Sequence, residues 1–290
     1  MNSVKEIPLY KMNGLGNQIV VLDARHYIGR VSALHARAIA GNPRTKYDQL
    51  MVVNKSCEIG VNAEIKIYNI DGSEAEACGN GMRCVAKIIG DRTAQMKFRT
   101  ASGILNVDFI DDLNITVDMG KPKFKWHEIP LRDEFFDTRK IELQAGPINE
   151  PILHSPSVCN MGNPHAIFWV EDINNIALEK FGFMLENHPI FPQRANITVA
   201  KILRSNHVLT RTWERGVGLT KACGSAACAV LACGVRKKIL DRQAQVSVPG
   251  GDLRIAWHSN NDGVLMTGPA EQEYQGIFKI LPFDSFKIEV

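Results

Sequence analysis

The stretch Ala77–Asn80, which reads Ala-Cys-Gly-Asn, returns as Ala222–Ser225, which reads Ala-Cys-Gly-Ser, with an offset of 145 residues between Cys78 and Cys223. Other short matches follow in the same order and at nearly the same offset: Gly16-Asn17 with Gly162-Asn163, Gln49 with Asn196, and Met119-Gly120 with Thr267-Gly268. Self-similarity at a constant spacing of about half the chain indicates a tandem duplication of one domain.

The residue pattern is that of a mixed α/β (α+β) protein. Short runs that are β-branched or alternating predict strands, at Ile7–Tyr10, Ile19–Leu22, Gln49–Val53, Ala63–Ile70, Met96–Thr100, Ile104–Phe109, Ile115–Met119, Ser157–Met161, Ala166–Val170, Asn196–Ile202, His207–Trp213, Ala244–Val248 and Leu253–His258. Start and stop signals predict three helices, at Ser32–Ala40, Asn80–Ile89 and Ser225–Ile239. Together with the repeat, they predict two pseudo-symmetric domains, residues 1–122 plus 269–290 and residues 123–268.

The length and composition of the chain exclude several classes of protein. The 290 residues are enough for two domains of roughly 100–200 residues each. A net charge of +3 is too small to indicate a nucleic-acid-binding protein. A hydrophobic fraction of 45% with 22% charged residues is typical of a soluble globular protein and excludes disorder for most of the chain. The N-terminus has no apolar segment of the kind found in signal peptides, and no apolar run is long enough to span a membrane, so we expect a cytoplasmic protein.

The chain has seven cysteines, an odd number that does not form a disulfide framework. We therefore expect free thiols. Most buried cysteines act as small apolar side chains. That interpretation covers five of them: Cys57, Cys159 and Cys233 as isolated residues, and Cys84 and Cys228 inside predicted helices.

Cys78 and Cys223 differ from the others because each comes directly before a predicted helix and is followed by glycine. Free backbone N–H groups and the positive end of the helix dipole favour an anion at such a position. We therefore expect the thiol pKa to be lowered there. The N–H groups of the next two residues are also able to hold a carboxylate, and the glycine lets it approach the backbone closely.

The repeat suggests a use for these two thiols. If the related domains face each other, Cys78 and Cys223 lie across one cleft, with a helix N-terminus behind each. One thiolate would then remove a proton from a carbon, and the other thiol would return a proton to the opposite face. This two-base reaction inverts a stereocentre without a metal or cofactor. The helix N-termini would stabilise negative charge that develops on a substrate carboxylate.

Two other uses of the thiols compete with this hypothesis. A zinc site is disfavoured because the spacings are C-x5-C and C-x4-C, with no CxxC and no nearby pair of histidines. A redox dithiol formed by Cys78 and Cys223 would also lack a CxxC motif. A non-catalytic redox or zinc-binding protein remains as the alternative from another class.

Taken together, six stretches resemble the diaminopimelate epimerase family: Lys11–Asn17 (KMNGLGN), Asn69–Glu74 (NIDGSE), Ala77–Cys84 (ACGNGMRC), Met161–His165 (MGNPH), Trp213–Gly216 (WERG) and Ala222–Cys228 (ACGSAAC). The resemblance extends from Lys11 to about Tyr274. It implies an isomerase, independent of pyridoxal phosphate, that interconverts LL- and meso-2,6-diaminopimelate on the route to lysine and peptidoglycan. It also implies two similar domains, each a curved sheet or barrel around a central helix.

The resemblance assigns roles to individual residues. Cys78 and Cys223 would be the catalytic acid and base, with His165 and Glu214 tuning the thiol pKa values. The substrate-binding positions would be Asn17, Gln49, Asn69, Gly79, Asn80, Asn163, Asn196, Glu214, Arg215, Gly224 and Ser225. Family members are usually homodimers, and Tyr274 matches a dimer-contact tyrosine. No metal, nucleic acid or membrane partner is implied.

Elementary chemistry agrees with part of this assignment. Arg215 is a natural bidentate partner for a carboxylate, and neutral amides can bind both carboxylate and ammonium groups. The closest rival is a two-thiol racemase or epimerase of proline or hydroxyproline, because such enzymes share the cysteine motifs. Asn80, where those enzymes typically carry histidine, and the presence of Arg215 argue against that rival.

Overall fold

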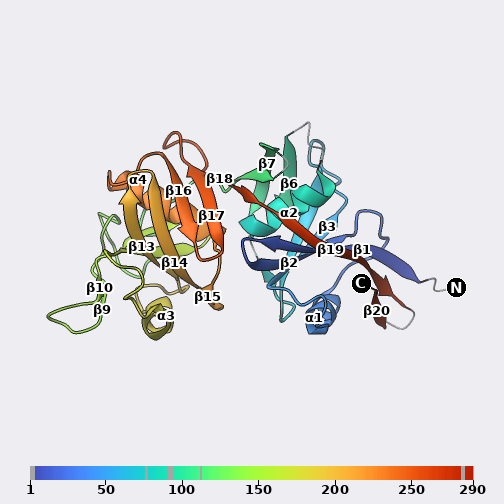
Figure 1. Cartoon of the computed structure of the whole chain (residues 1–290), viewed down its shortest axis with the longest axis horizontal. Helices are drawn as coiled ribbons and strands as arrows, with labels where there is room; N and C mark the ends of the chain where they lie inside the picture. Colours follow the sequence, from blue (N-terminus) through green and yellow to red (C-terminus); the bar gives the residue numbers. More distant parts are fainter. Residues whose placement is uncertain (1–3, 76–77, 91–94, 112, 282–284, 290) are drawn as a thin grey trace. The chain divides into compact units, whose positions relative to one another are not determined.

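The computed structural model describes residues 4–75, 78–90, 95–111, 113–281 and 285–289. The chain divides into two compact units, Met1–Val117 with Gly268–Val290, and Asp118–Thr267 (Figure 1). The unit boundaries thus fall at 117 and 267, where the repeat placed domain boundaries at 122 and 268. No helix in the described part of the chain is both long and apolar enough to cross a bilayer.

The first unit is a mixed sheet with two helices. Its elements are β1 (Lys5–Gly14), β2 (Asn17–Asp23), α1 (Ala33–Gly41), β3 (Gln49–Asn54), β4 (Ala63–Asn69), β5 (Glu74–Ala75), α2 (Gly79–Ile89), β6 (Met96–Thr100), β7 (Gly103–Phe109), β8 (Asn114–Asp118), β19 (Glu271–Ile280) and β20 (Phe286–Glu289). β1 lies between β2 and β19, antiparallel to both. β2 and β3 are parallel, as are β4 and β6, and the other pairs are antiparallel.

The second unit repeats this pairing scheme. Its elements are β9 (Gln144–Ala145), β10 (Leu153–His154), β11 (Ser157–Asn160), β12 (Pro164–Trp169), α3 (Leu178–Glu186), β13 (Asn196–Arg204), β14 (His207–Glu214), β15 (Gly218–Thr220), α4 (Gly224–Arg236), β16 (Gln243–Val248), β17 (Gly251–Ala256) and β18 (Leu265–Pro269). β12 and β13 are parallel, as are β14 and β16, whereas β11–β12, β13–β14, β14–β15 and β16–β17 are antiparallel. Each pairing has its counterpart in the first unit, so the predicted duplication is confirmed.

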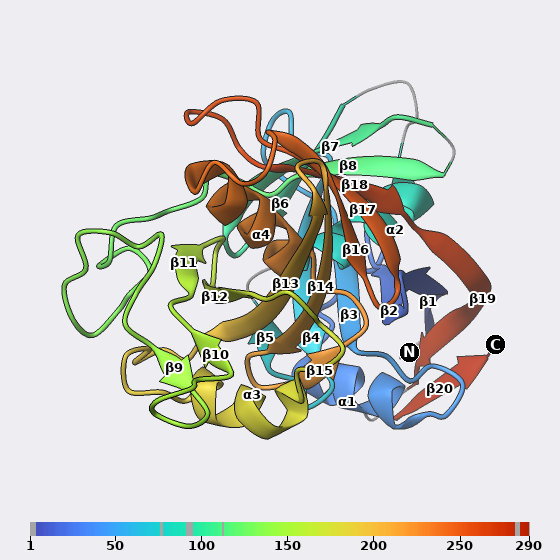
Figure 2. The ribbon, with the colours of Figure 1, turned by 60° about the vertical axis from the view of Figure 1, so that its left-hand side comes forward.

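A single helix forms the centre of each unit. α2 contacts the neighbouring strands β1, β2 and β3 and also β7, which is far from them in the order of the sheet. α4 likewise contacts the neighbouring strands β11, β12 and β13 and also β16 and β17 (Figure 2). A sheet whose separated strands reach one helix has to curve around it. Because α2 is buried from Gly79 to Ala86 and α4 from Ala226 to Gly234, both are helices that pack on all sides. The curved sheet around a central helix is therefore as expected.

Each unit buries its own apolar core. In the first unit, Leu22, Leu50 and Phe278 belong to a cluster that joins β2, β3 and β19. In the second, Phe168 and Val199 belong to a cluster that also includes buried apolar residues from the segment between Ile129 and Leu153. Burial of apolar surface is the dominant favourable contribution to folding, so each unit has a source of stability of its own.

The predicted elements are found with small shifts, and several elements were not predicted. The three predicted helices are α1, α2 and α4. The sequence prediction missed α3, the long β19, and the shorter β5, β9, β10, β15, β18 and β20. The burial pattern of β19 shows only two buried residues in ten, so it lacks the apolar alternation that identifies a strand.

Candidate active site

Cys78 is the N-cap residue of α2. Its backbone is extended, and its Sγ accepts a hydrogen bond from the backbone N–H of Gly81 at 3.2 Å. A Cβ atom on Gly81 would lie 2.4 Å from Met51 Sδ and 3.1 Å from Cys78 Sγ, so the close approach requires glycine. Ala77, which opens the repeated motif, lies outside the described residues. The predicted position of Cys78 at a helix start is confirmed.

Asn80 is the second residue of α2, and its side chain is hydrogen-bonded to a neighbour within the helix. Its Oδ1 accepts a hydrogen bond from Arg83 Nη2 at 2.8 Å, and Arg83 Nε donates to the carbonyl of Pro269 at 3.0 Å. Arg83 is fully buried. Sequence reasoning missed Arg83, although it stands within the first cysteine motif. It fixes the first turn of α2, where the N–H groups are expected to hold a carboxylate.

Three predicted amide side chains lie at neighbouring strand ends in the first unit. Gln49 opens β3 and is the register partner of Asn69 at the end of β4. Asn17 opens β2, and its Nδ2 donates to Asp48 Oδ2 at 3.3 Å. Asp48 also accepts from the backbone N–H of Gln18 at 2.8 Å. Asn17 Oδ1 is buried and has no hydrogen-bond partner among the described residues, so it can accept one from a ligand.

Cys223 holds the same position in the second unit, as N-cap of α4, and it is 6% exposed. Burial raises the pKa of its thiol well above the usual range, and the negative charge of Glu214 raises it further. Ser225 Oγ, 3.5 Å from Cys223 Sγ, and the backbone N–H of Ala226 oppose this rise. The expectation of a lowered pKa is therefore wrong for Cys223. The helix start acts in the expected direction, but burial outweighs it.

Glu214 ends β14 and is fixed by a second strand. Its register partner is Gly218 in β15, and its Oε1 accepts a hydrogen bond from Thr220 Oγ1 at 2.5 Å. The charge of Glu214 raises the pKa of Cys223, so the two side chains are electrostatically linked. This link agrees in kind with the expected pKa-tuning role, which stays a prediction.

His165 is fully buried in β12, opposite Asn196 in β13. Its Nε2 lies 2.7 Å from Asn163 Oδ1, and its Nδ1 is buried with no partner among the described residues. Burial and, to a smaller extent, the charge of Arg215 together lower the His165 pKa to about 3. The imidazole is therefore neutral near pH 7. With Nε2–H donating to Asn163, Nδ1 is left as a hydrogen-bond acceptor.

Asn196 and Arg215 are joined directly. The Nδ2 of Asn196 donates to the carbonyl of Pro164 at 3.0 Å, and its Oδ1 accepts from the backbone N–H of Arg215 at 3.0 Å. The Arg215 guanidinium donates to the carbonyl of Gln193 at 3.0 Å. The predicted site residues are divided between the two units. The second unit contains Asn163, His165, Asn196, Glu214, Arg215, Cys223, Gly224 and Ser225, and the first contains Asn17, Gln49, Asn69, Cys78, Gly79 and Asn80.

Tyr274 lies on β19, opposite Lys11 of β1. Its hydroxyl is buried without a hydrogen-bond partner among the described residues, and burial raises its pKa. A buried phenol hydroxyl usually has a partner, so an additional contact is expected there.

The remaining cysteines are buried, with one exception. Cys84, Cys159, Cys228 and Cys233 are buried, and burial raises the pKa of Cys84 to about 12. Cys57 is exposed after β3, so its interpretation as a buried apolar side chain is wrong. No group of three His, Cys, Asp or Glu residues that could hold a metal ion occurs within the described ranges.

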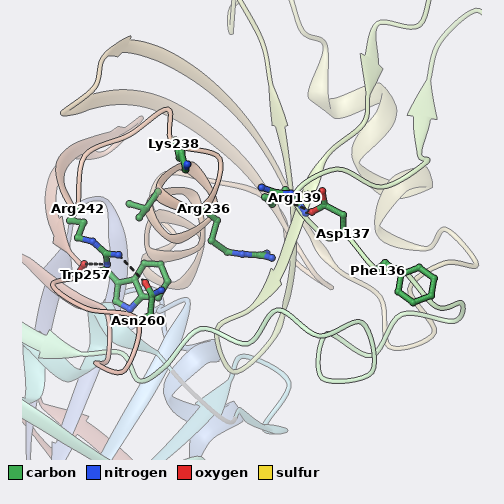
Figure 3. Close-up of a pocket in the computed structure, with 9 residues that line it drawn as sticks. Phe136, Asp137, Arg139, Arg236, Lys238, Arg242, Trp257 and Asn260 are labelled. Carbon is green, nitrogen blue, oxygen red and sulfur yellow. Dashed lines mark hydrogen bonds and ion pairs between the residues drawn. The ribbon is translucent and has the colours of Figure 1, made fainter.

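A basic cavity of about 410 Å³ lies at the C-terminal end of α4 (Figure 3). None of the predicted site residues lines it. Its lining residues are Phe136, Asp137, Arg139, Val235, Arg236, Lys238, Arg242, Trp257 and Asn260. Arg139 is paired with Asp137, and Arg242 donates to Asn260 and to the Trp257 carbonyl. Arg236 and Lys238 lie at the end of α4, where positive charge complements the negative end of the helix dipole.

Known proteins resemble the chain along nearly its whole length. A family model described as diaminopimelate epimerase matches residues 9–125 and 157–273. A diaminopimelate epimerase of Afipia carboxidovorans is 57% identical over 271 residues, which cover 92% of this chain and 93% of that protein. A diaminopimelate epimerase of Rhodopseudomonas palustris is 54% identical over 280 residues, covering 96% of each.

Solved structures share the fold at low sequence identity. A hydroxyproline epimerase from Agrobacterium vitis with bound trans-4-hydroxy-L-proline has a TM-score of 0.67 at 12% identity, over 97% of this chain and 93% of that chain. A phenazine biosynthesis PhzF-family protein from Enterococcus faecalis has a TM-score of 0.64 at 14% identity, over 94% of this chain and 99% of that chain. At these identities the likeness shows the architecture alone.

Proposed function

This chain belongs to the diaminopimelate epimerase family, and from that premise we propose that it interconverts LL- and meso-2,6-diaminopimelate with two cysteine thiols as acid and base. The observation that carries the proposal is the equivalent placement of Cys78 and Cys223, each as N-cap of the central helix of its unit. Such placement supplies a proton-transfer group and an anion-binding helix start at the same point.

In one direction, the Cys223 thiolate takes the α-proton of the substrate and becomes a thiol. The Cys78 thiol gives its proton to the opposite face of the same carbon and becomes a thiolate. In the other direction the roles are exchanged. One proton enters and one leaves the carbon, so the substrate changes configuration without a change in composition, and the chemistry needs no cofactor.

The substrate carboxylate next to the reacting carbon gains negative charge as the proton leaves. We assign its binding to the backbone N–H groups at the two helix starts, those of Gly79 and Asn80 in α2 and of Gly224 and Ser225 in α4. Donors that are already oriented toward developing charge lower the barrier without reorganisation. The extended N-cap backbone of both cysteines and the Arg83–Asn80 bond support this assignment.

The raised pKa of Cys223 fits a demanding proton transfer. An α-hydrogen of an amino acid is a very weak acid, and a thiolate of higher pKa is a stronger base. The cost is that fewer molecules carry the thiolate at neutral pH. The N–H of Ala226 and the hydroxyl of Ser225 stabilise the thiolate and offset part of that cost.

The distal end of diaminopimelate carries a second carboxylate and a second ammonium group. We propose that Arg215 binds this carboxylate and that Asn17, Gln49, Asn69, Asn163, Asn196 and Glu214 bind the remaining polar groups. The unpartnered Asn17 Oδ1 and His165 Nδ1 support this proposal, because both are acceptors that a substrate N–H group would satisfy.

We further propose a homodimer in the cytoplasm. Tyr274 on β19, which matches the dimer-contact tyrosine of the family, supports a contact with a second copy of the chain. Two reactive thiols that must stay reduced are suited to a reducing compartment. Light scattering of the wild-type protein, compared with Tyr274→Phe, tests the dimer.

Solvent deuterium incorporation tests the reaction. In D2O without added cofactor, the wild-type protein should place deuterium at an α-carbon of LL-diaminopimelate and leave L-proline unlabelled. Labelling of proline alone would favour the hydroxyproline-type alternative, whose fold this chain shares. Labelling of neither substrate would contradict the proposal.

Replacing either thiol tests the acid–base assignment. Cys78→Ala and Cys223→Ala should each lower epimerisation by at least about 10²–10⁴-fold, the usual contribution of a positioned acid or base. The exposed Cys57 supplies the matched control, and Cys57→Ala should retain full activity. Full turnover in either of the first two variants would rule out the two-thiol mechanism.

A further inference from the structure

Glu186, at the C-terminal end of α3, is a buried carboxylate outside the predicted site. Its side chain is 4% exposed, and both oxygens accept hydrogen bonds. Oε1 accepts from the backbone N–H of Gly216 at 2.8 Å and from Arg194 Nη1 at 3.2 Å. Oε2 accepts from Trp213 Nε1–H at 2.8 Å. A buried carboxylate is costly unless it is paired and hydrogen-bonded, and this one is both.

The Gly216 amide belongs to the turn that carries Arg215. The N–H of Val217 donates to the carbonyl of Glu214 at 3.0 Å, which closes a four-residue turn. Gly216 has a φ of +75°, as the third residue of a type II turn requires. The N–H of Arg215 is held by Asn196, and that of Gly216 by Glu186. Two successive amides of the turn are therefore fixed by side chains from outside it.

Glu186 also fixes the segment against which the Arg215 guanidinium rests. Arg215 Nη1 donates to the carbonyl of Gln193, and the next residue, Arg194, is the one that pairs with Glu186. Arg194 has a φ of +59°, an uncommon conformation for a residue with a side chain. The carboxylate thus constrains both the backbone of Arg215 and the surface beneath its guanidinium.

Glu214 is held differently. Thr220 Oγ1 donates to its carboxylate, and the β14–β15 pairing fixes its backbone opposite Gly218. A change at Glu186 should therefore move Arg215 more than it moves Glu214. Glu214 is also the residue whose charge acts on Cys223. Binding of the distal carboxylate by Arg215 and the effect of Glu214 on Cys223 consequently depend on separately anchored residues of one turn.

We propose that Glu186 is a positioning residue that orients Arg215 for the distal carboxylate of the substrate and so sets substrate affinity. The inference rests on the proposed function, in which Arg215 binds that carboxylate. Glu186 does not touch the substrate in this account. It acts through the Gly216 amide and the Gln193–Arg194 segment.

Glu186→Gln tests the proposal because it keeps the size of the side chain but removes one acceptor and the charge. We expect KM for diaminopimelate to rise about tenfold while kcat stays within about threefold, the pattern of lost ground-state binding. The matched control is Glu179→Gln on the same helix, whose carboxylate is exposed and pairs with Arg211. Glu179→Gln should change neither constant.

A double-variant cycle shows whether Glu186 acts through Arg215. If it does, adding Glu186→Gln to Arg215→Lys should raise KM by less than twofold beyond Arg215→Lys alone, since coupled residues are not additive. A full tenfold additional rise would overturn the proposal. So would an unchanged KM in Glu186→Gln, or a loss confined to kcat, which is the sign of a merely smaller folded fraction.

A second variant keeps the test open if Glu186→Gln does not fold. In the double variant Glu186→Gln with Trp213→Phe, the indole N–H that the new amide NH2 group would meet is removed. The amide oxygen can still accept the hydrogen bond from the Gly216 N–H. This pair should recover most of the wild-type KM, and failure to do so in a folded protein would contradict the proposal. Wild-type turnover separates the two hypotheses. A wild-type protein that is inactive on diaminopimelate contradicts the proposed function itself. An active wild-type protein whose KM is unchanged by Glu186→Gln contradicts only this inference.

Discussion

Cys78 and Cys223 occupy the same position in two repeats but have different surroundings. Cys78 accepts a hydrogen bond from the Gly81 N–H, whereas Cys223 lies near the carboxylate of Glu214. The motif Ala-Cys-Gly predicted both helix starts from residue order alone. It could not predict the pKa of Cys223, because burial and a charge nine residues earlier in the chain depend on the folded structure.

Removing the Glu214 charge should lower the pKa of Cys223. The negative carboxylate disfavours the thiolate, so Glu214→Gln should let Cys223 ionise at a lower pH. Iodoacetamide alkylation of Cys223, followed by peptide mass spectrometry across a pH series, measures the midpoint. Alkylation of the exposed Cys57 in the same samples controls for reagent reactivity. A midpoint that is unchanged or higher in Glu214→Gln would contradict the assignment.

His165 should make stability depend on pH in acid. Its folded pKa is about 3 and its ordinary value is 6.5, so unfolding takes up a proton between these values. Stability therefore falls as pH falls through that window, by up to about 1.4 kcal/mol per pH unit from this residue. Urea unfolding at several pH values should show a flatter dependence in His165→Gln than in the wild type. The exposed His154→Gln is the control, and equal slopes in wild type and His165→Gln would show that His165 does not titrate in this way.

At the scale of elements, the sequence predicted the helices that have clear boundaries and missed α3. This helix has nine residues, no side-chain cap at Ala177, and a glycine within it. Those features remove the usual start signal and lower helix propensity. The repeat offers another signal, since α3 (Leu178–Glu186) lies at an offset of 145 from α1 (Ala33–Gly41). Glu186 was missed as well, because it lies in this unpredicted helix and belongs to no recognisable motif.

Gly182 controls how closely α3 packs on β14. A Cβ atom there would lie 2.3 Å from Trp213 Cδ2, so α3 has to shift in Gly182→Ala. We expect a loss of about 1–3 kcal/mol in the free energy of unfolding, the usual cost of overpacking. Gly41→Ala on α1 is the matched control, since a Cβ atom there meets nothing within 4 Å. Urea denaturation measures both, and equal stabilities would show that α3 is not fixed by this contact.

At the scale of the molecule, the duplication was readable from the sequence because both copies kept short motifs in the same order. The role of β19 was not readable, because only two of its ten residues are buried and its partner β1 lies at the other end of the chain. Pairing of this kind depends on the fold rather than on local propensity. The first unit is consequently discontinuous in sequence, and the second is continuous.

The continuous unit should fold alone. Residues 118–267 contain their own apolar cluster and central helix. Expressed as a fragment, this part should show cooperative thermal unfolding and dispersed amide NMR signals, yet no epimerisation, because it has only Cys223 of the two proposed thiols. Residues 1–117 without β19 serve as the contrast and should unfold at lower temperature. A fragment 118–267 without a cooperative transition would show that the cores are interdependent.

The 145-residue offset also relates Asn69 to Glu214, an amide in one copy and a carboxylate in the other. Two identical subunits related by symmetry must present the same side chain at equivalent positions. Fusion of the copies into one polypeptide removes that constraint, so each half can diverge independently. The carboxylate of Glu214, which stands where the first copy has the amide of Asn69, is therefore a difference that gene fusion permits and that an assembly of identical single domains could not encode.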